Sequence, residues 1–168
     1  MGDVKDLKAQ PAIEKMKELA EDAKLCMFCS GLTNIPFNTR PMATQQVDEE
    51  GNIWFLSEEH SEKNADIAAD NRVQLIYSNR SSQEYMSIYG KAEIIVDPAK
   101  AKELWNVFLT TWFHEGHNDP NLTLIKVTPT EGHYWDTKHN KMVQSIKIVI
   151  GAIKGKMMDD GVSGKLKV

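Results

Sequence analysis

The chain has 168 residues, a formal net charge of -4, 41% hydrophobic residues and 26% charged residues. This length and composition predict one globular domain over residues 1–168, with less ordered tails at residues 1–10 and 156–168. The negative charge gives no electrostatic reason to expect nucleic acid or an anionic membrane as a partner. The sequence contains no membrane-spanning apolar stretch and no apolar signal-peptide core near its start, so we expect a cytoplasmic protein.

The first predicted element is an amphipathic helix over residues 11–24, because apolar residues recur there at steps of three and four between charged ones. Two short strands follow at 25–32 and 37–48, and the glycine, asparagine and proline between them favour a hairpin. The sequence DEEGN then predicts a turn before a strand at 53–57. We therefore expect three antiparallel strands in chain order.

Further strands and helices are predicted after this hairpin. Ser61 is a candidate cap for a short helix, and strands are expected at 72–79 and at 84–97, where Gly90 favours a bulge. Asp97 and Pro98 predict the start of a helix. That helix would run to residue 113 and carry its apolar side chains along one face; these are Leu104, Val107, Phe108 and Trp112.

Two last strands are expected at 122–136 and 142–153. Many short strands with turn signals, and no strict alternation of strand and helix, disfavour a parallel doubly wound sheet. The predicted fold class is therefore mainly β: an antiparallel barrel of six to seven strands with peripheral helices.

Cys26 and Cys29 form a C-x-x-C motif, which occurs in redox-active proteins and in zinc sites. A redox pair would be expected at a helix start, whereas apolar neighbours here indicate a buried strand. The later histidines do not show the spacing of zinc ligands. We expect two structural thiols and no metal site, and keep redox action of the pair as an alternative.

Ser57, Ser61 and Lys63 gather where a predicted strand ends and a helix begins. Hydroxyl groups, an ammonium group and the free N–H groups of a first helical turn together favour a bound phosphate. Arg40, on a preceding strand, could add a bidentate donor. The alternative is a capping serine at a solvated helix start, and the acidic Glu58, Glu59 and Glu62 would have to point away from a phosphate.

The sequence TRPMATQQVDEEGNIWFLSEEHSEKNADIAADNRVQLIY resembles the FMN-binding segment of the pyridoxamine 5'-phosphate oxidase-like split-barrel superfamily, in particular its general stress protein 26 group. The resemblance runs from about residue 20 to about residue 150. Its most specific elements are R-P-M on one strand and W-F-L-S-x-x-x-S-x-K on the next. The resemblance implies a split barrel that binds FMN.

The resemblance also assigns residues to the cofactor. It implies that Arg40, Ser57, Ser61 and Lys63 hold the FMN phosphate. It further implies contacts with the ring from Pro41, Met42 and Ala43, with the ribityl chain from Phe55 and Leu56, and with the flavin from Tyr85 and Trp135, Tyr85 reaching it from a second subunit. Glu62 departs from the basic residue usual in the family, and the arginine–histidine motif for pyridoxal phosphate is replaced by WDTKHNKMVQ.

The function expected from the resemblance is that of an FMN-dependent, stress-related oxidoreductase whose substrate and catalytic residues are unknown. The alternative is a flavin- or haem-binding stress or sensor module without turnover. FAD or a deazaflavin in place of FMN also stays open. A homodimer with flavin at the interface is expected, and Trp105, Trp112 and Phe113 are candidates for an apolar contact between subunits or for the core of one subunit.

Overall fold

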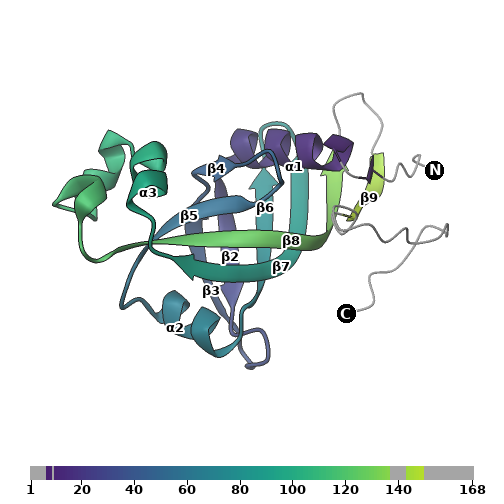
Figure 1. Ribbon diagram of the computed structural model, residues 1–168. Coiled ribbons are helices and arrows are strands. Elements are labelled where there is room, and N and C mark those ends of the chain that lie inside the picture. The colour runs from purple at the N-terminus through teal and green to yellow at the C-terminus, as the bar shows by residue number, and fades with distance from the viewer. Residues whose placement is uncertain (1–6, 9, 137–142, 150–168) are drawn as a thin grey trace.

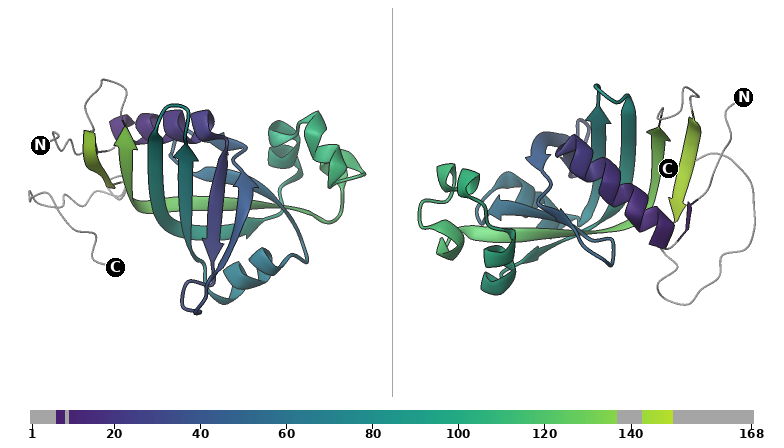
Figure 2. Two further views of the ribbon diagram at one scale, coloured as in Figure 1. Left: turned by 180° about the vertical axis from the view of Figure 1, so that it is seen from behind. Right: turned by 90° about the horizontal axis from the view of Figure 1, so that it is seen from above.

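The computed structural model describes residues 10–136 in full and residues 7–8 and 143–149 as backbone. Its strands form one curled sheet, with α1 (Gln10–Ala23) and α2 (Glu62–Ala69) at opposite ends of the barrel (Figure 1). The short helix α3 (Pro98–Leu104) and the 3-10 helices η1 (Val107–Thr111) and η2 (Gly116–Asn118) project from one side of the barrel (Figure 2).

Nine strands are described, and seven of them have six residues or more. They are β1 (Leu7–Lys8), β2 (Leu25–Ser30), β3 (Asn38–Ala43), β4 (Gln46–Val47), β5 (Ile53–Glu58), β6 (Arg72–Asn79), β7 (Glu84–Ile95), β8 (Leu122–Asp136) and β9 (Val143–Val149). Every pairing is antiparallel except the short parallel contact of β1 with β9. The predicted fold class is confirmed. The predicted tail at 156–168 lies outside the described residues.

The strand order is β1-β9-β8-β7-β6-β2-β3, and β5 joins the sheet through β8. The strand predicted over 37–48 is divided into β3 and β4, and the predicted antiparallel pairing across the DEEGN turn is confirmed over two residue pairs between β4 and β5. Within the described residues, β3 and β5 share no ladder. The local turn signal was correct, but β5 takes its main partner about 70 residues further along the chain. The barrel is therefore split between β3 and β5.

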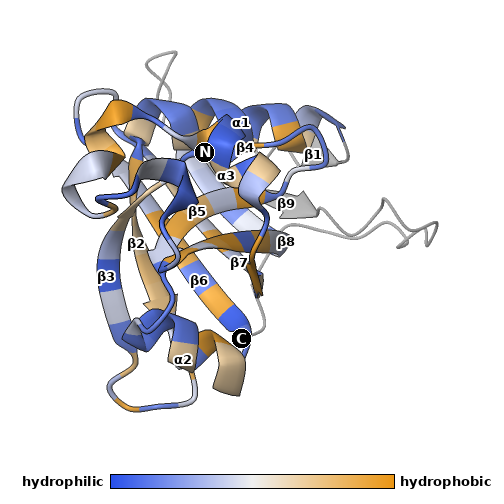
Figure 3. Ribbon diagram, turned by 60° about the vertical axis from the view of Figure 1, so that its left-hand side comes forward, coloured by the Kyte–Doolittle hydropathy of each residue, from blue (hydrophilic) through white to orange (hydrophobic). Residues whose placement is uncertain are grey.

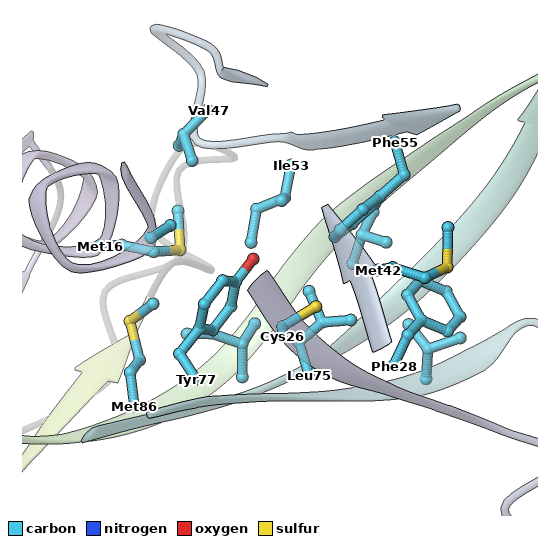
Figure 4. Close-up of a cluster of buried hydrophobic side chains, with 14 of the residues drawn as sticks. Met16, Cys26, Phe28, Met42, Val47, Ile53, Phe55, Leu75, Tyr77 and Met86 are labelled. Carbon is cyan, nitrogen blue, oxygen red and sulfur yellow. The ribbon is translucent and has the colours of Figure 1, made fainter. Parts of the chain in front are cut away.

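The main core fills the inside of this barrel (Figure 4). Alternate residues of β2, β6 and β7 point inward, as the two-residue period of a strand requires. The rings of Phe28 and Phe55 meet edge to face with centroids 5.4 Å apart, and both residues are fully buried. The apolar face of α1 covers one end of the barrel with Ala12, Ile13, Met16, Leu19 and Ala20.

A second apolar cluster packs α3 and the segment after it against β5 and β8; it comprises Trp54, Ala101, Leu104, Phe113, Leu122 and Leu124. The predicted helix over 98–113 is wrong beyond Leu104, because Trp105 is extended and the Asn106 side chain then caps η1 by accepting the Phe108 N–H. The break turns part of the predicted apolar face outward. Phe108 and Trp112 are 79% and 70% exposed.

Gly90 lies at the register shift between β7 and β8, which confirms the predicted bulge. A Cβ atom at this position would lie 2.5 Å from the Thr128 carbonyl oxygen and 3.0 Å from Pro129 Cα. Both neighbours belong to the backbone, so neither can move away without disturbing the longest pair of strands.

We predict that Gly90→Ala lowers the free energy of unfolding by about 2 to 3 kcal/mol, the usual cost of forcing an extra group into a filled site. Urea denaturation followed by circular dichroism measures this directly. An unfolding midpoint equal to that of the wild type would show that the bulge has room for a side chain.

Candidate functional site

The candidate phosphate site lies at the split of the barrel, beside α2. Arg40 comes from β3, Ser57 from the end of β5, and Ser61 and Lys63 from the start of α2. Arg40 is on the same side of its strand as buried Met42, so it faces the interior of the barrel and not the outer surface of the sheet. The fold thus brings the four residues predicted to hold a phosphate to one end of the barrel.

Two of these residues, Ser57 and Ser61, belong to a hydrogen-bond network that fixes the start of α2. Ser61 is the N-cap and accepts the N–H of Asn64. Ser57 is 2% exposed, donates to Asn64 Oδ1 at 2.7 Å and lies 3.1 Å from Ser61 Oγ. Asn64 also donates to Thr123 Oγ1 on β8 at 3.0 Å. The serines therefore hold the helix start in place, and the predicted capping role of Ser61 is confirmed.

Arg40 is held by two residues that the sequence did not single out, Ser30 and Asp66. Its Nη1 donates to Ser30 Oγ at 2.7 Å, and its Nη2 lies 3.5 Å from Asp66 Oδ2. Burial acts to raise the pKa of Asp66, but hydrogen bonds from Ser30 and Asn38 together with the charge of Arg40 outweigh it and leave the pKa lowered. Asp66 follows Lys63 by three residues, so helical spacing alone could have placed both side chains on one face.

Lys63 is a half-buried cation with no hydrogen bond or ion pair to any described residue. Burial lowers its pKa, the positive charge of nearby Arg40 lowers it further, and Glu58 acts in the opposite direction. Arg40 and Lys63 lie near each other, and of the two only Arg40 forms an ion pair with a carboxylate among the described residues. Glu58, Glu59 and Glu62 are all exposed to solvent. The site is therefore suited to an anion.

The residues predicted to border the ring and the ribityl chain divide between the core and the surface. Pro41 and Ala43 are exposed on β3, whereas Met42 is 9% exposed and belongs to the main core. Phe55 is fully buried against Phe28, and Leu56 packs against the second cluster. The Phe55 side chain is therefore closed off from a ligand, whereas Leu56 stays partly exposed.

Tyr85 and Trp135 are direct neighbours on β7 and β8, and each is 42% exposed. They lie on the outer face of the sheet, because the next pair along the two strands, Met86 and Tyr134, points into the core. Trp135 also stacks on His133 with ring centroids 6.2 Å apart. Within one chain, this pair is therefore on the other side of the sheet from Arg40.

Cys26 and Cys29 are free thiols buried on β2, which confirms their predicted place in a buried strand. Burial raises the pKa of Cys26 to about 12, the hydrogen bond with Tyr77 acts in the opposite direction, and Cys29 adds to the rise. A neutral, buried thiol is a poor nucleophile. The arrangement favours the structural interpretation of this motif over redox action.

Away from the split, oxygen atoms of Glu18, Asp22 and Glu84 lie within 4.8 Å of one another. Glu18 and Asp22 belong to α1, at the end of the barrel opposite α2 (Figure 1). Exposed acidic groups are common without an ion, and we assign no metal to them. Among the helices that the structure describes, none is long and apolar enough to cross a membrane.

Comparison with known proteins identifies the family of the chain. The sequence matches the family model described as pyridoxamine 5'-phosphate oxidase like over residues 11–159. The chain belongs to this family. The family assignment confirms the resemblance that the R-P-M and W-F-L-S-x-x-x-S-x-K motifs indicated.

Solved structures with the same fold carry related names. A protein related to general stress protein 26 from Clostridium acetobutylicum superposes with a TM-score of 0.67 at 20% identity, over 84% of this chain and 96% of that one. General stress protein 26 from Bacillus anthracis gives 0.65 at 21% identity, over 73% and 92%. The general stress FMN/FAD binding protein from Xanthomonas citri gives 0.63 at 22% identity, over 92% and 96%.

A curated relative, protein bli-3 from Neurospora crassa, is 24% identical over 127 residues, which cover 70% of this chain. The match spans 61% of that protein. The solved structures share the pyridoxamine 5'-phosphate oxidase-like fold with this chain, and their low identity extends the likeness no further than the fold.

Proposed function

We propose that the chain binds FMN at the split of the barrel and acts as an oxidoreductase on a small molecule. The observation that carries this proposal is the pair Arg40 and Lys63, two cations beside the start of α2 with only one paired to a carboxylate. A phosphate monoester fits this donor set, because it would accept hydrogen bonds from Lys63, from Arg40 and from the first helical turn.

The family and the Xanthomonas citri structure described as FMN/FAD binding support a flavin as the carrier of that phosphate. FMN would supply hydride or electron transfer when bound, while Arg40, Lys63 and Ser61 would bind and orient it. The stress-related names of the neighbours support a role in a stress response. The cytoplasmic location expected from the sequence stays a prediction.

We further propose that two chains associate through the outer face of the sheet. Among residues 10–136, eleven large hydrophobic residues are highly exposed, and five of them lie on this face: Leu25, Met27, Ile76, Tyr85 and Trp135. Strand register aligns them, since Met27 pairs with Ile76 and Tyr85 pairs with Trp135. Hydrophobic residues are visible on β2 and β6 in Figure 3. Exposed apolar side chains gathered on one face of a sheet are typical of an interface.

This association would also explain the position of Tyr85 and Trp135. In one chain they are on the outer face, away from the inward-facing Arg40. A second chain packed on that face could bring its own Tyr85 and Trp135 to a flavin whose ring extends from the split past exposed Pro41 and Ala43. The phosphate and the ring would then be held by different subunits.

The proposal is tested with purified protein and excess FMN. After removal of unbound FMN we expect retained flavin absorbance, followed by bleaching with NADH or NADPH and repeated reoxidation in air. A colourless protein would contradict flavin binding. Retained flavin that neither NADH nor NADPH reduces repeatedly would favour a flavin-binding or sensor module over an enzyme. Retained haem would favour a haem-binding module instead.

A further inference from the structure

A triangle of side chains links three elements beside the proposed phosphate site. Arg40 on β3 donates to Ser30 Oγ on β2 at 2.7 Å, and Ser30 Oγ donates to Asp66 Oδ2 on α2 at 2.6 Å. Arg40 Nη2 closes the triangle at 3.5 Å from Asp66 Oδ2. Ser30 is fully buried, so this geometry is set by the fold and not by solvent.

The hydroxyl of Ser30 has a single hydrogen, and that hydrogen points to Asp66. Its lone pairs are therefore the acceptors that Arg40 meets. Asn38, the first residue of β3, adds a further donor to Asp66 Oδ2 at 3.0 Å and so anchors the carboxylate. The guanidinium has five N–H groups in a rigid fork, and only part of that fork is used here. The remaining N–H groups are available to an anion.

We propose that Asp66 is a positioning residue which, through Ser30, holds the guanidinium of Arg40 in the orientation that receives the phosphate of the bound nucleotide. This inference rests on the proposed function. Holding the side chain in advance removes the cost of ordering a flexible arginine when the ligand binds.

Asp66 acts on a phosphate in two opposite ways. Its negative charge, taken alone, repels the ligand, whereas its hold on Arg40 prepares a donor for it. Removal of Asp66 would tighten phosphate binding if repulsion were the larger effect and weaken it if positioning were the larger effect. The sign of the change in affinity therefore decides the matter.

The test compares FMN with riboflavin, which differ only in the phosphate, by fluorescence titration of the wild type, Asp66→Ala and Ser30→Ala. We expect each variant to lose about 10-fold in affinity for FMN, the scale of one hydrogen bond to a charged group, with riboflavin affinity unchanged. Tighter FMN binding by Asp66→Ala would overturn the proposal, and so would equal losses for both ligands.

Ser30→Ala keeps the charge of the site, so it tests the positioning of Arg40 through Ser30 even if Asp66→Ala does not fold. The matched control is Thr128→Ala, which removes a hydroxyl bonded to Asn52 and absent from the triangle; its FMN affinity should equal that of the wild type. If Thr128→Ala lost as much FMN affinity as Ser30→Ala does, the result would count against a specific positioning role for Ser30.

A double-mutant cycle separates positioning from a general effect on structure. In an Arg40→Ala background, Asp66→Ala should cause no further loss of FMN affinity, because its effect acts through the missing guanidinium. A full additional loss would overturn the proposal. A wild type that binds FMN no more tightly than riboflavin would overturn the phosphate site itself, whereas a clear wild-type preference kept by both variants would overturn only the positioning role.

Discussion

Replacing Lys63 with alanine is expected to weaken FMN binding by about 1.5 to 3 kcal/mol, the range for a hydrogen bond to a charged group, or roughly 10- to 150-fold in Kd. The reason is that Lys63 is a half-buried cation without a bonded anion among the described residues. Burial and the nearby Arg40 lower the pKa of Lys63, which means that they disfavour its charged form in the folded chain. A bound phosphate would stabilise that charged form.

Isothermal titration with FMN and with riboflavin measures the effect. Riboflavin affinity should not change, because riboflavin has no phosphate for Lys63 to contact. The matched control is Lys17→Ala, which removes an exposed lysine of α1 at the other end of the barrel. If Lys63→Ala binds FMN as tightly as this control does, the phosphate lies elsewhere.

Much of the site was predictable because its signals are local in the sequence. A serine before a polar helix predicted the cap at Ser61, and the spacing of Ser61 and Lys63 placed both at the start of α2. Ser30 could not be found in this way. It is the last residue of the strand that carries the C-x-x-C motif, and it meets Asp66 only because β2 and α2 come together across 36 residues of chain.

The errors in the fold have the same origin. Local turn chemistry predicted the turn between β4 and β5, but it could not show that the strand predicted over 37–48 would divide into β3 and β4, or that β5 would also pair with β8 and leave the barrel open beside β3. The apolar period over 98–113 suggested one helix, whereas Phe113 is buried in the second cluster through a 3-10 turn that exposes Trp112. Long-range packing overrode helical propensity there.

Ile76→Glu is expected to convert the proposed dimer to monomers while leaving the fold of each chain intact. Ile76 is 45% exposed at the middle of the outer face of the sheet, opposite Met27 on β2 and Ser87 on β7. A buried carboxylate without a partner at such an interface typically costs several kcal/mol, about 3 to 5. In the separate chain the same carboxylate meets water, so thermal stability of the monomer should change little.

Analytical ultracentrifugation of Ile76→Glu against the wild type measures the change, and Trp112→Glu supplies the competing arm. Trp112 is 70% exposed on the projecting segment after α3, which the sequence also offered as a contact between subunits. Dissociation by Ile76→Glu alone would place the interface on the sheet, and flavin bound by Tyr85 and Trp135 should then be lost with the dimer. Dissociation by Trp112→Glu alone would move the interface to η1 and leave Tyr85 without a route to the partner's flavin.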